Sequence, residues 1–214
     1  MSGETLALAA TAASLGFIHT LAGPDHYVPF IMIAKARGWS LLKTAFVTFL
    51  CGIGHILSAV LLGIIGLGFG FALSSIEAFD SVRDNIAAWL FIAFGLVYFV
   101  WGVRKAFRGR HGHGHAHEGR AGGAGITPWV LFTIFVFGPC EVLIPLLMYP
   151  AAKNSLMDAA YVTLVFGAVT ITTMLGIVMV SMFGFNLLPL GKIERYTHAL
   201  AGLAIVVCGV LIII

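Results

Sequence analysis

Residues 19–26 read His-Thr-Leu-Ala-Gly-Pro-Asp-His and interrupt an apolar stretch that starts near the N-terminus. Proline removes a helical hydrogen bond and glycine permits a sharp turn, so Gly23-Pro24 predicts a break in the first helix. On an unbroken helix, His19 and His26 would share a face but stand about 10.5 Å apart along the axis. The break can fold Asp25 and His26 back toward His19, and the backbone groups that it frees must then line a cavity or the protein interior.

The composition around this break is that of a membrane protein. Of the 214 residues, 60% are hydrophobic and 10% are charged, whereas a soluble domain carries about 25% charged residues. The net charge of +3, with no basic helix, argues against nucleic-acid binding. A transmembrane helix needs about 20 mostly apolar residues. Six runs free of Asp, Glu, Lys and Arg meet this length or come within one residue of it: 5–24, 44–76, 85–103, 121–140, 159–191 and 196–214.

Lysine and arginine residues predict the orientation of these spans. Ten of them lie in alternate loops, and the remaining loops hold only Arg83 and Lys153. Cytoplasmic loops carry the excess of positive charge, so the ten-residue group is expected in the cytoplasm of a bacterial-type inner membrane, with both termini outside. The group comprises Lys35, Arg37, Lys43, Arg104, Lys105, Arg108, Arg110, Arg120, Lys192 and Arg195.

The sequence also contains an internal repeat. A shift of 115 residues places Gly23-Pro24 on Gly138-Pro139, and seven of the 17 residues from position 40 to position 56 are then identical. Because each half has three spans, the second half must enter the membrane from the opposite side. We therefore expect an all-α polytopic membrane protein of six transmembrane helices in two inverted three-helix repeats, with broken first and fourth helices. The repeats are residues 1–103 and 126–214, joined by a His-rich cytoplasmic linker, 104–125.

Ionisable side chains inside or beside the apolar runs predict a metal site. Such groups are costly in a membrane and usually mark a pathway or a bound ion, and thiolate, carboxylate and imidazole together suit a borderline transition metal. The candidate ligands are His19, Asp25, His26, His55, Cys140 and Glu141. The candidate pathway-lining residues are Thr170, Thr172 and Thr173, because the repeat places Thr170 opposite His55. The alternatives are a helix-capping Asp25, hydrogen-bonded structural histidines, a Cys140 that only packs, and threonines bonded to their own helix.

The linker carries a second group of candidate ligands. It reads Arg-Gly-Arg-His-Gly-His-Gly-His-Ala-His from residue 108, so His111, His113, His115 and His117 alternate with small residues. Short His-rich tracts bind divalent metals, and we expect this one to capture or sense metal at the cytoplasmic face. The alternative is a soluble basic linker in which the histidines are incidental.

The two broken-helix motifs resemble a known family. Residues 16–27, GFIHTLAGPDHY, and residues 137–147, FGPCEVLIPLL, resemble the UreH-like (urease-accessory) branch of the nickel/cobalt transporter (NiCoT/NicO) superfamily. The resemblance implies that the His-Asp-His element binds the metal during transport. The chain departs from the related permeases in having five residues, not four, between His19 and Asp25, and in offering six spans where the permeases usually have eight.

The resulting hypothesis is a permease that moves a divalent transition-metal ion, nickel or cobalt, by alternating access. The metal is then the cargo, and neither a permanently bound cofactor nor enzyme activity is expected. The expected partners are the lipid bilayer, the divalent ion, and urease or other nickel-enzyme maturation proteins, with no nucleic acid; the oligomeric state is left open.

Two further functions fit the same residues. One is a metal-binding sensor or a metalloenzyme-assembly protein without transport. The other is a thiol redox carrier, because some thiol-reductant carriers resemble this fold class and have a proline-flanked cysteine in each half. Here Cys140 follows Pro139, but Asp25 takes the matching place after Pro24. The sequence therefore disfavours a two-cysteine shuttle.

Overall fold

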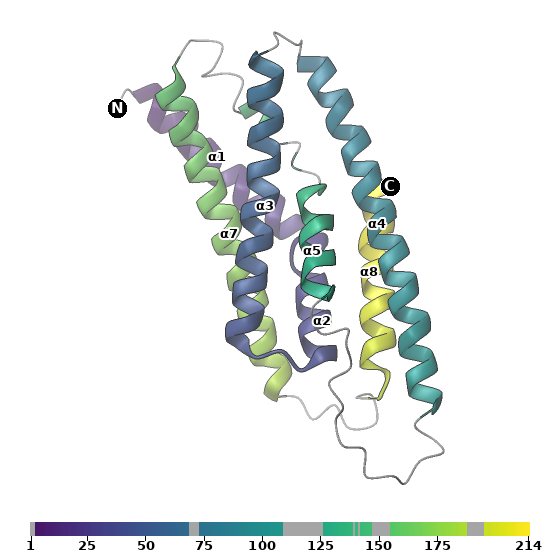
Figure 1. Ribbon diagram of the computed structural model, residues 1–214. Coiled ribbons are helices and arrows are strands. Elements are labelled where there is room, and N and C mark those ends of the chain that lie inside the picture. The colour runs from purple at the N-terminus through teal and green to yellow at the C-terminus, as the bar shows by residue number, and fades with distance from the viewer. Residues whose placement is uncertain are drawn as a thin grey trace.

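The computed structural model describes residues 3–68, 73–108, 126–138, 140, 142–146, 155–187 and 195–214. Every regular element assigned in these ranges is a helix (Figure 1). In chain order the elements are α1 (Gly3–Ala22), η1 (Pro24–His26), α2 (Val28–Arg37), α3 (Leu41–Gly68), α4 (Leu73–Arg108), α5 (Ile126–Val136), α7 (Leu156–Leu187) and α8 (Thr197–Ile213).

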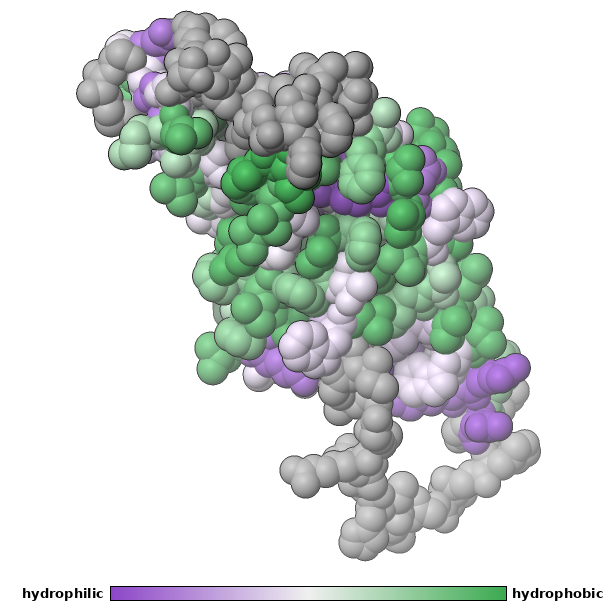
Figure 2. Space-filling model, turned by 45° about the horizontal axis from the view of Figure 1, so that its top comes forward, coloured by the Kyte–Doolittle hydropathy of each residue, from purple (hydrophilic) through white to green (hydrophobic). Residues whose placement is uncertain are grey.

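The helices make this chain an integral, polytopic membrane protein. Four of them are long and apolar enough to cross a bilayer: α1, and the segments Leu41–Ile65 of α3, Ala78–Arg108 of α4 and Leu156–Phe185 of α7. The helices α5 and α8 are apolar but shorter, with 11 and 17 residues. On the face seen in Figure 2, hydrophobic side chains cover the middle of the molecule and hydrophilic ones lie toward its lower and upper ends. The sequence predicts six membrane-spanning helices, and this number stays a prediction.

The first helix breaks where the sequence predicts. The helix α1 ends at Ala22, the 3-10 turn η1 begins at Pro24, and α2 starts at Val28. Gly23 closes α1 by donating its amide to the carbonyl of His19 at 3.0 Å. The helix α2 in turn ends at Arg37 and is capped by Gly38, whose φ of 60° lies in the left-handed region that glycine adopts without strain. The break thus turns the chain without leaving the interior of the bundle.

Helices from both halves of the chain are interleaved. The N-terminal α1 packs along α7, α3 lies between α5 and α7, and α4 packs along α8 (Figure 1). The short α2, which continues beyond the break in α1, contacts α8 and α7. The predicted first and second repeats therefore share one interior, and the breaks after α1 and α5 both lie within it.

Candidate functional site

Three histidines and one cysteine meet inside the bundle, and we call them the His–Cys cluster: His19, His26, His55 and Cys140. They come from the last turn of α1, from η1, from the middle of α3 and from the break after α5. One ligand atom each of His19, His55 and Cys140 lie within 4.8 Å of one another. The ring of His26 stands edge-on between the other two imidazoles, with centroids 4.7 Å from His19 and 5.2 Å from His55.

Backbone carbonyls hold two of these rings in one tautomer. His55 Nδ1 lies 3.3 Å from the carbonyl oxygen of Phe135, and His26 Nδ1 lies 3.2 Å from that of Gly23. A carbonyl only accepts, so each Nδ1 carries a proton, and each ring presents the lone pair of Nε2 when it is neutral. The Nε2 atoms of His19, His26 and His55 are all buried without a hydrogen-bond partner in the described structure. Buried nitrogen atoms of this kind are rarely left unpartnered.

Two glycines allow the close approaches in this cluster. A Cβ on Gly23 would stand 2.7 Å from His26 Nδ1 and 2.9 Å from Asp25 Oδ1, and one on Gly138 would stand 3.3 Å from His55 Nδ1. Asp25 itself accepts from His26 Nδ1 at 3.3 Å. The Gly-Pro pairs that break the helices therefore also make room for the imidazoles.

Cys140 is completely buried, and its surroundings include charges that the sequence argument did not use. It lies within electrostatic range of three α4 side chains, Asp80, Arg83 and Asp84, which are themselves buried. Arg83 pairs with Asp80 at 2.5 Å and also donates to Ser58 of α3 at 3.4 Å. The spacing 80, 83, 84 could have revealed this group, because it places all three side chains on one helix face. The third apolar run was taken to begin at Asn85, which left these three residues in a loop.

A cavity of about 490 Å³ reaches the cluster from one side. It brings His19 and Asp25 together with Asp84, although the last lies on a different helix. The remaining lining residues are Ala22, Gly23, Pro24, Val142, Leu211 and Ile212. A cavity of this size with carboxylates in its lining admits water and small solutes, and His19 is the member of the cluster that lines it.

The other candidate residues lie apart from the cluster or outside the described structure. Thr170 is buried on α7 where α1 packs against it, next to Gly16. Thr173 is half-buried and Thr172 is exposed on the outer surface of α7. Glu141 and the linker histidines His111, His113, His115 and His117 lie outside the described residues. The pathway and metal-capture roles of these residues stay predictions.

The arrangement supports two kinds of chemistry. An imidazole lone pair beside a thiol can take its proton and leave a nucleophilic thiolate. The same nitrogen and sulfur atoms can also bind a transition-metal ion. All three cysteines of the chain, Cys51, Cys140 and Cys208, are buried free thiols. Of these, Cys140 belongs to the His–Cys cluster, and Cys208 on α8 lies within electrostatic range of Asp25.

The fold and the site thus define a polytopic helical membrane protein with a buried thiol–imidazole centre. A family model described as the cytochrome C biogenesis protein transmembrane region matches residues 28–211. The chain belongs to this family. No curated protein and no solved structure matches the chain. The matched region contains His55 and all three cysteines, whereas His19, Asp25 and His26 precede it.

The family corrects three of the sequence-based predictions. The resemblance to the nickel/cobalt transporters was wrong, and so were the function of nickel or cobalt transport and the description of the chain as a permease. The Gly-Pro breaks that suggested the transporters are compatible with many membrane proteins, because non-helical backbone is tolerated at membrane depth wherever it is buried in protein or lines a cavity. They do not say what the polar groups do. The thiol redox carrier, which the sequence disfavoured, agrees better with the family.

Proposed function

We propose that this chain is a membrane-embedded thiol redox protein of cytochrome c biogenesis, with Cys140 as its reacting thiol. The observation that carries the proposal is the position of Cys140 within 4.8 Å of ligand nitrogens of His19 and His55. A thiol reacts as thiolate, and an adjacent neutral imidazole is the usual base that produces one. The position that matches Cys140 in the first half holds Asp25, so the chain works with one thiol at this centre.

The reaction on this proposal is thiol–disulfide exchange with an incoming protein. The proton of Cys140 moves to a lone pair of His55 or His19, and the thiolate attacks one sulfur of the incoming disulfide. A bond forms between the two sulfurs, the original S–S bond breaks, and the second sulfur leaves as a thiolate that is then protonated. A thiol from a second protein next attacks the sulfur of Cys140 in the mixed disulfide, which releases the first protein with both of its thiols reduced and bonds Cys140 to the second protein. A neighbouring thiol of the second protein then attacks that protein's own sulfur in the new mixed disulfide, so that a disulfide forms within the second protein and Cys140 leaves as a thiolate. Electrons pass between the two partners, and Cys140 is regenerated.

We further infer the arrangement in the membrane that suits this role. Six helices in two inverted three-helix repeats would place the breaks after α1 and α5 at the same depth. This inference is supported by the interleaving of helices from both halves and by the contacts of α1 with α7 and of α5 with α3, which are equivalent under such a repeat. The positive-inside rule then places the basic end of α2 and α4 in the cytoplasm.

The first test reads the reactivity of Cys140 directly. The full chain in nanodiscs is treated with the uncharged reagent 2,2′-dithiodipyridine, which releases one coloured pyridinethione for each mixed disulfide formed. We expect the Cys51→Ser/Cys208→Ser variant to react as wild type does. His55→Gln should slow the reaction by about a hundredfold or more, the typical contribution of a general base. His198→Gln, which changes a histidine remote from the cluster, is the matched control.

Two results would reject the thiol proposal. One is a Cys140→Ser variant that still releases pyridinethione at the rate of wild type. The other is a Cys140 that reacts equally fast with and without His55. Circular dichroism and the unfolding temperature of each variant show that the helices are intact.

A second candidate function is the binding of one transition-metal ion by the same cluster, without transport. The specific observation is the group of three buried Nε2 atoms that no described residue satisfies, beside a thiol at ligand distance. Metal-binding histidines commonly donate their other ring N–H to a carbonyl or a carboxylate, as His55 and His26 do here. Such an ion would suit a sensor or an accessory protein in metalloprotein assembly.

The metal test separates the two functions. In a background with His111, His113, His115 and His117 changed to Gln, which removes the linker tract, Zn²⁺ is titrated and Co²⁺ serves as a spectroscopic probe. One ion per chain, a thiolate-to-cobalt band and loss of both in Cys140→Ser would support metal binding. His55→Gln should weaken the affinity by at least about tenfold, as the loss of a ligand does. Zn²⁺ binding that is indifferent to both substitutions would reject this candidate.

A further inference from the structure

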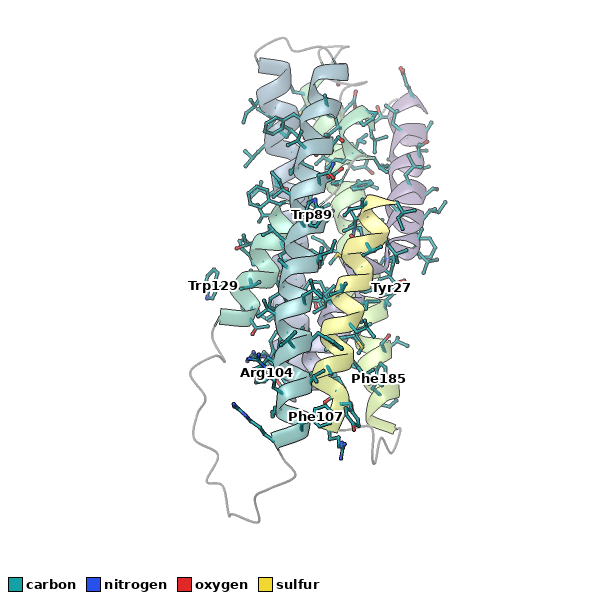
Figure 3. All side chains as sticks on the ribbon, turned by 90° about the vertical axis from the view of Figure 1, so that its right-hand side faces the viewer. Tyr27, Trp89, Arg104, Phe107, Trp129 and Phe185 are labelled. Atoms are coloured by element: carbon teal, nitrogen blue, oxygen red, sulfur yellow. The ribbon has the colours of Figure 1, made fainter. Side chains whose placement is uncertain are left out.

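A second polar cavity, which we call the basic pocket, lies at the end of the molecule far from the His–Cys cluster. It measures about 420 Å³ and is formed where α2 and α4 end and α8 begins. This is the lower end in Figure 1, and in Figure 3 the labelled Arg104, Phe107 and Phe185 lie toward it. The lining residues are Ala34, Lys35, Ala36, Gly38, Trp39, Lys105, Met182, Arg195, Thr197 and His198.

The charges in this pocket are all of one sign. Lys35, Lys105 and Arg195 line it, and none of the lining residues that the structure describes is acidic. Two of these cations bind neutral groups: Lys35 donates to the carbonyl of Phe185 at 3.2 Å, and Arg195 donates to the hydroxyl of Tyr196. Three cations that converge without a carboxylate repel one another, and an anion between them removes that cost.

A neutral histidine positions Lys105 at the pocket. Lys105 Nζ lies 2.9 Å from His198 Nε2, and His198 Nδ1 lies 2.9 Å from the hydroxyl of Tyr98. A lysine ammonium only donates, so Nε2 is the acceptor, and Nδ1 donates its proton to Tyr98. His198 is therefore neutral, and it leaves the charge of Lys105 uncompensated. The ring of Trp101 lies 5.3 Å from the same ammonium.

We propose that the basic pocket binds a phosphate group. Lysine and arginine together suit phosphate, because guanidinium binds its oxygens in pairs and ammonium adds a compact charge. The cavity has the size of a small-molecule site. The group is carried either by the headgroup of an anionic phospholipid, which basic pockets between transmembrane helices bind, or by a soluble phosphate compound. Trp39 and Trp101, residues typical of the membrane interface, lie beside the cations.

The experiment uses the full chain purified in detergent. Native mass spectrometry measures the retention of phosphatidylglycerol and phosphatidylcholine, and equilibrium dialysis measures the binding of radiolabelled inorganic phosphate. The variants are Lys105→Gln and Arg195→Gln. The matched control is Arg104→Gln, because Arg104 neighbours Lys105 in sequence but is exposed and projects from α4 away from α8 (Figure 3). We expect each pocket variant to weaken binding about fivefold, the contribution of one basic residue to an anionic surface.

The two measurements identify the source of the phosphate. Selective retention of phosphatidylglycerol that falls in both pocket variants assigns a lipid headgroup. Saturable inorganic phosphate binding that falls in the same variants, without lipid selectivity, assigns a soluble compound. The proposal is overturned if neither ligand binds, or if Arg195→Gln and Arg104→Gln change binding equally. The Lys105→Gln variant loses the contact with His198 and could fold less well for that reason. The Arg195→Gln variant keeps this contact, so it tests the pocket independently.

Discussion

The chemistry of individual residues explains why the centre is suited to thiol or metal reactions. Each of His26 and His55 gives its Nδ1 proton to a backbone carbonyl, and His26 shares this proton with Asp25, so the fold fixes Nε2 as the reactive nitrogen of both rings. Such preorganisation places the base without reorganisation at the moment of reaction. The Nε2 atom of His19 has no hydrogen-bond partner in the described part of the chain, and the residue lines the cavity, which makes it the most adaptable of the three.

At this scale, Gly23 is expected to be the most sensitive backbone position. Gly23→Ala would place a methyl group 2.7 Å from His26 Nδ1 and 2.9 Å from Asp25 Oδ1, so the His26 ring must leave its position. We expect a cost of about 1–3 kcal/mol in stability, as for an overpacked core. The pyridinethione release by Cys140 should fall as well, because the cluster loses its geometry. Thermal unfolding and the release assay measure the two effects.

The control for this change is Gly176→Ala on α7, where an added Cβ meets no atom within 4 Å. It should leave both the unfolding temperature and Cys140 reactivity unchanged. A Gly23→Ala variant that behaves like Gly176→Ala would show that the break does not position His26.

Between elements, the closest packing joins α4 to α8. An added Cβ on Gly202 would stand 2.3 Å from the amide nitrogen of Phe99 and 2.7 Å from the carbonyl oxygen of Gly95. On Gly102 it would stand 2.4 Å from the amide nitrogen of Ala199. Small residues let the backbones of membrane helices approach closely. Because lipid is as apolar as the helices, van der Waals contact rather than the hydrophobic effect then holds them together. Since α8 has only 17 residues, this contact is its main support.

We therefore predict that Gly202→Ala loosens α8 from α4. The obstructing atoms belong to the backbone and cannot move aside as a flexible side chain would, so the expected destabilisation is about 1–3 kcal/mol or more. The unfolding temperature in detergent measures the loss, and faster alkylation of Cys208 on α8 reports the opening. Gly184→Ala, on α7 in open space, is the control. Unchanged stability and unchanged Cys208 alkylation in Gly202→Ala would contradict the prediction.

In the molecule as a whole, interleaving brings distant parts of the chain to one centre. His19 and His26 come from the first break, His55 from α3 and Cys140 from the second break, so no single half holds the cluster. The sequence predicted these four residues because a polar side chain within an apolar run is visible by itself. It missed Asp80 and Asp84, which lie just before a run. It also predicted that Thr172 lines the pathway together with Thr170, and only the fold shows that Thr172 faces outward.

The function was harder to predict than the site. The motif at residues 19–26 suggested the nickel/cobalt transporters, but these residues lie before the region, 28–211, that the cytochrome c biogenesis family shares. Imidazole and thiol groups serve as metal ligands and as redox groups alike. A list of residue types therefore cannot separate the two chemistries.

The sequence by itself determined that this is a helical membrane protein, that the first helix breaks at Gly23-Pro24, and which end of the molecule carries the positive charge. These properties depend on local composition, on the geometry of single residues and on the absence of water in the bilayer. Only the tertiary structure decided that ligand atoms of His55, Cys140 and His19 lie within 4.8 Å of one another, and that Lys35, Lys105 and Arg195 share one pocket. Such neighbours depend on how close the helices approach, which the packing of side chains and glycines throughout the bundle sets.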